Sequence, residues 1–119
     1  MYQIDFYEDD KGYSAVKEFI LDLRKHSATD KNKRINLQKT VAYLDALEQY
    51  GTRVGAPITK HLDGEIWELR PLKNRFLYAY YKENNFIILH VFIKKTRKTP
   101  KKELEKAKKN LADFLERNP

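Results

Sequence analysis

The chain has 119 residues, enough for one domain (residues 1–119) with a single modest core, and 34% of them are charged. The absence of cysteine excludes disulfides, thiolate metal sites and cysteine nucleophiles, and the absence of long apolar runs and of a signal-peptide pattern predicts a cytoplasmic protein without a membrane partner. The net charge is +7, and residues 94–119 alone hold ten Lys and Arg against four Asp and Glu, which indicates a polyanion partner, most commonly a nucleic acid.

The first half of the chain is predicted to form a strand and two helices. Residues 2–7 alternate apolar and polar side chains, which is typical of a short strand. Ser14 is a suitable N-cap for a first helix, and Asp30 for a second, longer helix that ends at Gly51. Each helix carries an apolar stripe, so we expect the two to form an antiparallel hairpin.

The second half is predicted to be mainly strands. Residues 52–64 have the Gly and Pro content of a loop, and strands follow at residues 66–70, 75–82 and 86–93. The last of these is almost wholly apolar, which favours a central strand covered on both faces. Thr99 and Pro100 then match the N-cap and first position of a C-terminal helix.

The resulting order is β-α-α-β-β-β-α, which predicts a compact α+β domain. We expect an antiparallel sheet of about four strands, with the N-terminal strand at its edge. Two N-terminal helices and one C-terminal helix are expected to pack on one face of this sheet.

Several cations are predicted to meet on the other, open face. Arg70 and Arg75 flank a short turn between two strands, so their side chains are expected to be close in space. Lys60 and His61 precede the first of these strands, and basic residues from Lys94 onward follow the last. Guanidinium groups bind phosphate through two parallel hydrogen bonds.

Such a cluster suits cleavage of RNA by its own 2′-hydroxyl group. That reaction needs a base for the hydroxyl, cations for the pentavalent phosphorane and an acid for the leaving 5′-oxygen. His61 is a candidate acid or base near neutral pH. The carboxylates Asp63, Glu65 and Glu68 lack the spacing of metal ligands, so we expect neither a metal site nor a cofactor.

Ordinary structural roles also account for these residues. Arg70 and Arg75 can pair with Glu68 and Glu65 across strands, and a lysine run is often only a solvated helix face. A single loop histidine such as His61 is more often structural than catalytic.

Three segments in order resemble the RelE/ParE superfamily of toxins from bacterial type II toxin–antitoxin systems. They are Lys60–Arg70 (KHLDGEIWELR), Arg75–Tyr78 (RFLY) and Phe92–Pro100 (FIKKTRKTP). The similarity is greatest to the phage-derived, HigB-like branch. No single segment is diagnostic, but three at the right spacing make a specific match.

The resemblance implies a microbial-RNase-like fold and an endoribonuclease that cuts messenger RNA, usually in the 30S ribosomal A site. It implies inhibition of translation and growth arrest. It also implies a cognate helix-turn-helix antitoxin, with the toxin–antitoxin complex expected as a heterotetramer on operator DNA.

The resemblance also assigns roles to individual residues. Arg70 and Arg75 match the arginines that hold the scissile phosphate, and Lys60, His61 and Lys95 are the other expected catalytic residues. The expected RNA-binding residues are Lys94, Arg97, Lys98, Lys101 and Lys102. Some relatives have a catalytic Tyr or His in the C-terminal segment, but residues 101–119 contain neither, so the general base stays open between His61 and a lysine.

Two other functions fit the same superfamily or charge. One is a ParE-like inhibitor of DNA gyrase without nuclease activity, and the other is a non-catalytic basic RNA-binding module. The predicted meeting of arginines and lysines favours the nuclease, because a gyrase inhibitor needs no phosphate-binding cleft.

Overall fold

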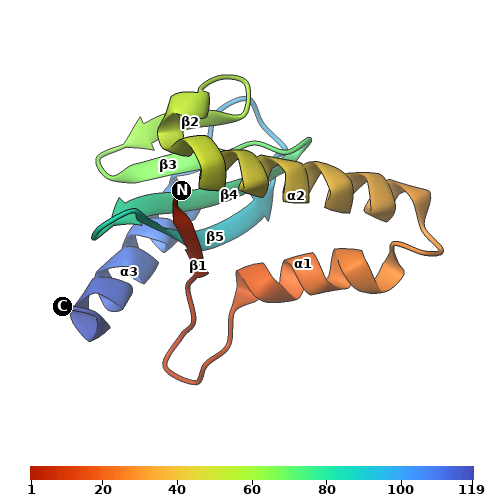
Figure 1. The fold of residues 1–119 in the computed structure, drawn as a ribbon. Helices are drawn as coiled ribbons and strands as arrows, with labels where there is room; N and C mark the ends of the chain where they lie inside the picture. The colour runs from red at the N-terminus through yellow and green to blue at the C-terminus, as the bar shows by residue number, and fades with distance from the viewer.

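The computed structural model describes all residues, 1–119, as one five-stranded sheet with helices on both sides (Figure 1). The elements in chain order are β1 (Gln3–Phe6), α1 (Ala15–His26), α2 (Lys31–Tyr50), the 3-10 helix η1 (Gly51–Val54), β2 (Thr59–Asp63), β3 (Ile66–Leu69), β4 (Asn74–Tyr81), β5 (Asn85–Ile93) and α3 (Lys101–Arg117). The α+β class and three helices are therefore as predicted.

The strands lie in the order β1-β5-β4-β3-β2. β1 pairs with β5 in parallel, and the other neighbours are antiparallel. The N-terminal strand is thus at one edge, as expected, but the sheet is mixed and has five strands rather than about four. Its second edge is β2, in the segment that was predicted to be a loop.

β2 is an edge strand whose sequence lacks the usual pattern of a strand. Thr59 is buried, donates a hydrogen bond from its hydroxyl to the Glu68 carbonyl (2.8 Å) and lies 2.7 Å from the Tyr78 hydroxyl. The next two residues, Lys60 and His61, are exposed. With one buried polar residue and charged neighbours, the segment lacks the apolar alternation by which strands are usually found.

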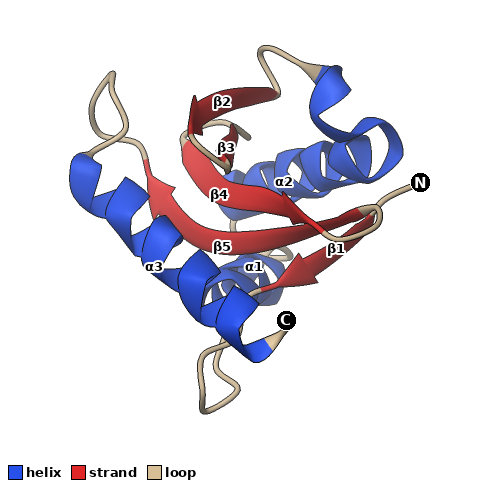
Figure 2. Ribbon diagram, turned by 90° about the vertical axis from the view of Figure 1, so that its left-hand side faces the viewer, coloured by secondary structure: helices blue, strands red, loops and turns tan.

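Both faces of the sheet are covered, which corrects the expectation that all helices share one face. α1 and α2 lie on one side and α3 on the other (Figure 2). Phe76 and Tyr78 of β4 belong to the core under α1 and α2, and the intervening Leu77 and Ala79 belong to the core under α3. Because successive side chains of a strand point to opposite faces, this apolar run needs a cover on each.

The predicted helix caps hold at the first two helices. The Ser14 hydroxyl and the Asp30 carboxylate each accept a hydrogen bond at 3.1 Å from a backbone N–H in the first turn. Gly51 ends α2 with a φ of 62°, which glycine adopts without strain. At α3 the prediction is wrong: the N-cap is Pro100, and the Thr99 hydroxyl bonds to Glu68 instead.

A bulge in β5 adapts the sheet to α3. Leu77 pairs with His90 and Tyr78 with Ile88, so Leu89 is an extra residue in the ladder. The freed Leu89 carbonyl accepts a hydrogen bond from the buried amide of Asn110 on α3 (2.9 Å). The bulge thereby lets both Leu89 and His90 face α3.

None of the three helices combines the length and apolar character needed to cross a membrane.

Candidate functional site

Two arginines meet at the end of the sheet where β3 turns into β4. The turn between Arg70 and Arg75 contains Leu72 with a φ of 58°, a left-handed conformation that is uncommon for a leucine. Arg75 stabilises this turn from within: its Nη1 donates to the carbonyls of Leu72 (2.8 Å) and Asn74 (2.9 Å). The two N–H groups on Nη2 have no hydrogen-bond partner in the chain.

Glu68 joins the two arginines. Its Oε1 lies 3.4 Å from Nε of Arg70 and 3.8 Å from Nε of Arg75. Its Oε2 accepts a hydrogen bond from the Thr99 hydroxyl (2.8 Å). Glu68 is only 4% exposed and Arg75 only 6%, whereas the Arg70 side chain is 29% exposed. Glu68 thus holds the arginines in place and connects them to the segment before α3.

This segment, residues 94–100, closes the site into a narrow cleft, which we call the arginine cleft. The backbone N–H of Lys94 donates to the Lys73 carbonyl (2.7 Å), so the segment is attached to the β3–β4 turn at one end and to Glu68 at the other. The free space inside is about 20 Å³, room for roughly one water-sized group.

The arginine cleft has a large excess of positive charge. Six cations line it against a single carboxylate, that of Glu68; the cations are Arg70, Arg75, Lys94, Lys95, Arg97 and Lys98. Burial lowers the pKa of the Arg75 guanidinium, and the charge of Glu68 opposes that shift. An arginine nevertheless stays protonated in proteins, so the cleft presents fixed positive charge that Glu68 only partly neutralises.

The structure does not bring His61 to this cleft. His61 lies opposite Trp67 in the β2–β3 ladder, and their rings are 5.1 Å apart on the face that holds α1 and α2. Its Nε2 lies 2.8 Å from the carbonyl of Gly64. Glu68 faces the other way, because residues 67 and 68 are successive in a strand. The expected meeting of the imidazole with the arginines is therefore wrong.

Three predicted lysines also lie outside the arginine cleft. Lys60 pairs with Glu68 in the backbone ladder, but its side chain is exposed and does not line the cleft. Lys101 and Lys102 are exposed in the first turn of α3, where Lys101 lies 3.8 Å from Glu105. They can add long-range attraction for an anion without touching a phosphate held by Arg75.

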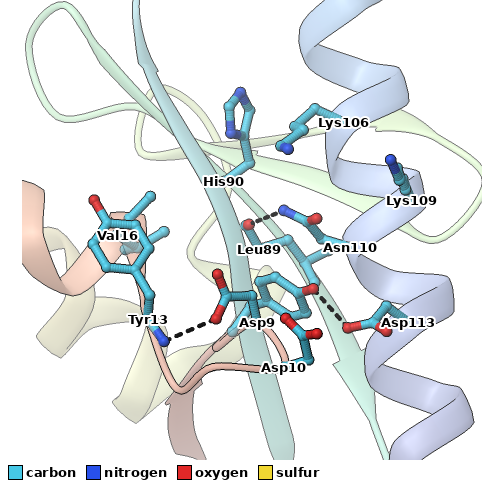
Figure 3. A pocket seen from close by; sticks show the side chains of 12 residues that line it. Asp9, Asp10, Tyr13, Val16, Leu89, His90, Lys106, Lys109, Asn110 and Asp113 are labelled. Atoms are coloured by element: carbon cyan, nitrogen blue, oxygen red, sulfur yellow. Dashed lines mark hydrogen bonds between the residues drawn. The ribbon is translucent and has the colours of Figure 1, made fainter.

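A larger cavity, of about 520 Å³, lies between α3, β5 and the loop after β1; we call it the α3 cavity (Figure 3). His90, Lys106 and Lys109 lie at one end of it, and Asp9, Asp10 and Asp113 at the other. The three His, Asp and Glu side chains needed to hold a metal ion gather neither here nor elsewhere in the chain.

Many charges of the α3 cavity are already paired within the chain. The Tyr7 hydroxyl and Arg117 each donate to Asp113 at 2.6 Å, and these hydrogen bonds lower the pKa of Asp113. Nε2 of His90 lies 2.8 Å from Glu103. Backbone N–H groups of Lys11 and Tyr13 donate to Asp9 and lower its pKa. These contacts give Asp9, His90 and Asp113 structural roles within the folded chain.

The sequence from residue 22 to residue 112 matches the family model of the phage-derived Gp49-like proteins. The chain belongs to the Gp49-like family. This membership confirms the resemblance, seen in the sequence, to the phage-derived branch of the RelE/ParE superfamily. No curated protein matches the sequence of this Gp49-like protein.

A solved structure supports the fold. A chain of the YoeB-YefM complex from Staphylococcus aureus aligns with a TM-score of 0.50 and 15% sequence identity, over 80% of this chain and 99% of that one. At this identity the likeness shows a common fold, so functional roles must come from this protein's own cleft.

Two residues of the arginine cleft were missed as functional candidates. The sequence indicates Glu68 only as a salt-bridge partner or a poorly spaced metal ligand, and Thr99 only as a helix cap. Alternation along β3 does place Glu68 and Arg70 on one face, which was a usable signal. Nothing in the sequence indicates that Thr99 reaches back to Glu68.

Proposed function

We propose that this Gp49-like protein is the toxin of a type II toxin–antitoxin system and a metal-independent endoribonuclease acting on messenger RNA in the cytoplasm. The observation that carries the proposal is the arginine cleft, with two arginines around one buried carboxylate and four further cations. Family membership and the fold support the same function.

The cleft supplies charge where the reaction develops it. In the proposed step the RNA 2′-oxygen attacks the adjacent phosphorus, the bond from phosphorus to the 5′-oxygen breaks, and the products carry a 2′,3′-cyclic phosphate and a 5′-hydroxyl. The phosphorane gains negative charge on its non-bridging oxygens. Arg70 and the free Nη2 of Arg75 are placed to donate hydrogen bonds to them.

Glu68 is the proposed general base. It is the only carboxylate that lines the arginine cleft, and His61 is on the other face of the sheet. Glu68 would take the proton of the 2′-hydroxyl, and Lys94 or Lys95 would give one to the leaving 5′-oxygen. This assignment replaces the two candidates that the sequence left open, His61 and a lysine, with a residue that already contacts both arginines.

The proposed partners follow from the same family. We propose a helix-turn-helix antitoxin that neutralises the protein and joins it in a heterotetramer on operator DNA. The aligned chain itself comes from a two-protein complex, of YoeB with YefM. The proposed substrate is messenger RNA in the 30S A site, and the exposed lysines at the start of α3 would add attraction to ribosomal RNA.

Single-turnover incubation with messenger RNA on programmed ribosomes tests the proposal, alongside a supercoiling assay with purified gyrase. We expect cleavage within the A-site codon and no effect on gyrase. Intact messenger RNA together with blocked supercoiling would replace the nuclease with a ParE-like gyrase inhibitor. Binding of RNA with neither effect would leave a non-catalytic RNA-binding module.

A further inference from the structure

The two arginines are also reached from the side opposite residues 94–100. There they border an open groove of about 300 Å³, the lower end of the range for small-molecule sites. We call it the α2 groove, and its lining residues are Lys39, Tyr43, Pro57, Arg70, Leu72 and Arg75. With about 20 Å³ of free space in the arginine cleft, this groove is the roomier approach to Arg75.

An aromatic ring and a cation lie together in the α2 groove. Tyr43 is half-buried on α2, packed against the core, and it is close enough to Arg75 to influence the pKa of that guanidinium. Nζ of the exposed Lys39 lies 5.6 Å from the centre of the Tyr43 ring. Leu72, which is 46% exposed, adds an apolar surface. No acidic residue lines the groove, so Lys39 has no partner of opposite charge there.

This combination matches the chemistry of one nucleotide of a single strand. Aromatic side chains stack on unpaired bases, and nearby cations bind the backbone phosphates. Nζ of Lys39 lies over the Tyr43 ring, so a base that stacks there would displace it toward the next phosphate along the strand. The phosphate of the stacked nucleotide would lie beside the arginines. The hydrogen bond from Arg75 to the Leu72 carbonyl fixes the turn between the two arginines, and both arginines line the same groove.

We propose that the α2 groove binds the nucleotide next to the scissile phosphate, with Tyr43 as the stacking residue and Lys39 as a second phosphate contact. The proposal rests on the proposed ribonuclease function and adds a binding subsite to it. It makes Tyr43 a positioning residue for RNA, outside the group that carries out the chemical step.

The test compares Tyr43→Ala and Tyr43→Phe with wild type in single-turnover cleavage on programmed ribosomes. Loss of one stacked base costs roughly 1–3 kcal/mol, so we expect Tyr43→Ala to raise the half-saturating protein concentration about 5- to 150-fold. Tyr43→Phe keeps the ring and should behave as wild type. The matched control is Tyr50→Ala, an exposed tyrosine (55%) on the same helix that does not line the groove.

A second variant, Lys39→Ala, and a binding measurement test the groove independently of the cleavage rate. Lys39→Ala removes an exposed side chain without disturbing the core. In a plot of the logarithm of the binding constant against the logarithm of the salt concentration, it should lower the magnitude of the slope by about 0.7. Binding is measured with messenger RNA that is 2′-deoxy through the A-site codon, because it cannot be cleaved. Tighter binding by wild type than by Tyr43→Ala and Lys39→Ala supports the groove.

Two negative results separate the inference from the proposed function. If wild type cleaves RNA, and Tyr43→Ala and Lys39→Ala bind as tightly as Tyr50→Ala, the groove assignment is wrong and the ribonuclease stands. If wild type cleaves nothing on ribosomes, the ribonuclease function itself is wrong, and the groove assignment falls with it.

Discussion

The arginine cleft and the α3 cavity differ in opposite ways in their free volume and in their unpaired charge. The α3 cavity has about 520 Å³ of space, but hydrogen bonds within the chain already engage Asp9, His90 and Asp113. The arginine cleft has about 20 Å³, yet it gathers six cations around one carboxylate. Unmatched charge therefore identifies the candidate site better than volume does.

The same contrast divides the basic C-terminal segment. Lys94, Lys95, Arg97 and Lys98 line the arginine cleft before α3 begins, whereas Lys101 and Lys102 are exposed on the helix and outside it. The first set can touch a bound phosphate. The second can act on RNA only through longer-range attraction, which salt screens.

The largest effect is expected from Glu68→Gln. Removing a general base lowers cleavage by roughly 100- to 10,000-fold. RNA binding should tighten at the same time, because the cleft loses its one negative charge. The measurements are single-turnover cleavage and binding of uncleavable messenger RNA by the same preparation.

Thermal unfolding of Glu68→Gln controls for loss of structure, since the variant leaves the buried Arg75 without its charged partner. Cleavage at the wild-type rate by a folded Glu68→Gln protein would contradict its role as the base.

A smaller effect is expected from the double variant Lys101→Ala with Lys102→Ala. The maximal cleavage rate should stay near that of wild type, but ribosome binding should weaken and its log–log salt slope should fall by about 1.4 to 1.8. The matched control replaces Lys25 and Lys31, two exposed lysines on α1 and α2. An unchanged salt slope would show that the α3 lysines do not contact the ribosome.

The smallest effect on activity is expected from Asp113→Asn in the α3 cavity. The folded protein lowers the pKa of Asp113 below its ordinary value of about 3.8, through hydrogen bonds from Tyr7 and Arg117. This contribution to stability is present above that value and disappears as the pH falls through the lowered folded-state pKa. The variant should therefore unfold more easily than wild type at pH 7, with little difference below the folded-state pKa.

Denaturant unfolding at a series of pH values measures this effect, and cleavage at pH 7 should be unchanged. A loss of cleavage in a folded Asp113→Asn protein would mean that the α3 cavity takes part in the reaction.

The sequence predicted the parts of the fold and site that depend on local pattern. The cap residues Ser14 and Asp30, the end of α2 at Gly51 and the closeness of Arg70 and Arg75 all follow from short-range spacing. The meeting of these arginines with residues 94–100 followed from the order of the strands.

What the sequence did not predict depends on long-range packing. α3 covers the second apolar face of β4 and β5. The apolar run at residues 86–93 predicted that this face is covered, but the local pattern does not show which helix covers it. β2 is defined by its ladder with β3 and by the contact of the Thr59 and Tyr78 hydroxyls, neither of which appears in the local sequence pattern. This strand carries His61 away from the arginines. The Thr99–Glu68 hydrogen bond joins residues 31 positions apart, beyond any local pattern.

The most direct test compares Arg75→Ala in the arginine cleft with Lys109→Ala in the α3 cavity, in one single-turnover assay on programmed ribosomes. Arg53→Ala, an exposed arginine outside both, controls for loss of a cation. We predict that Arg75→Ala lowers the cleavage rate at least about 100-fold, because it removes a donor to the phosphorane, while Lys109→Ala and Arg53→Ala cleave like wild type. Near-wild-type cleavage by Arg75→Ala, or an equal loss in Lys109→Ala, would contradict the assignment of the arginine cleft.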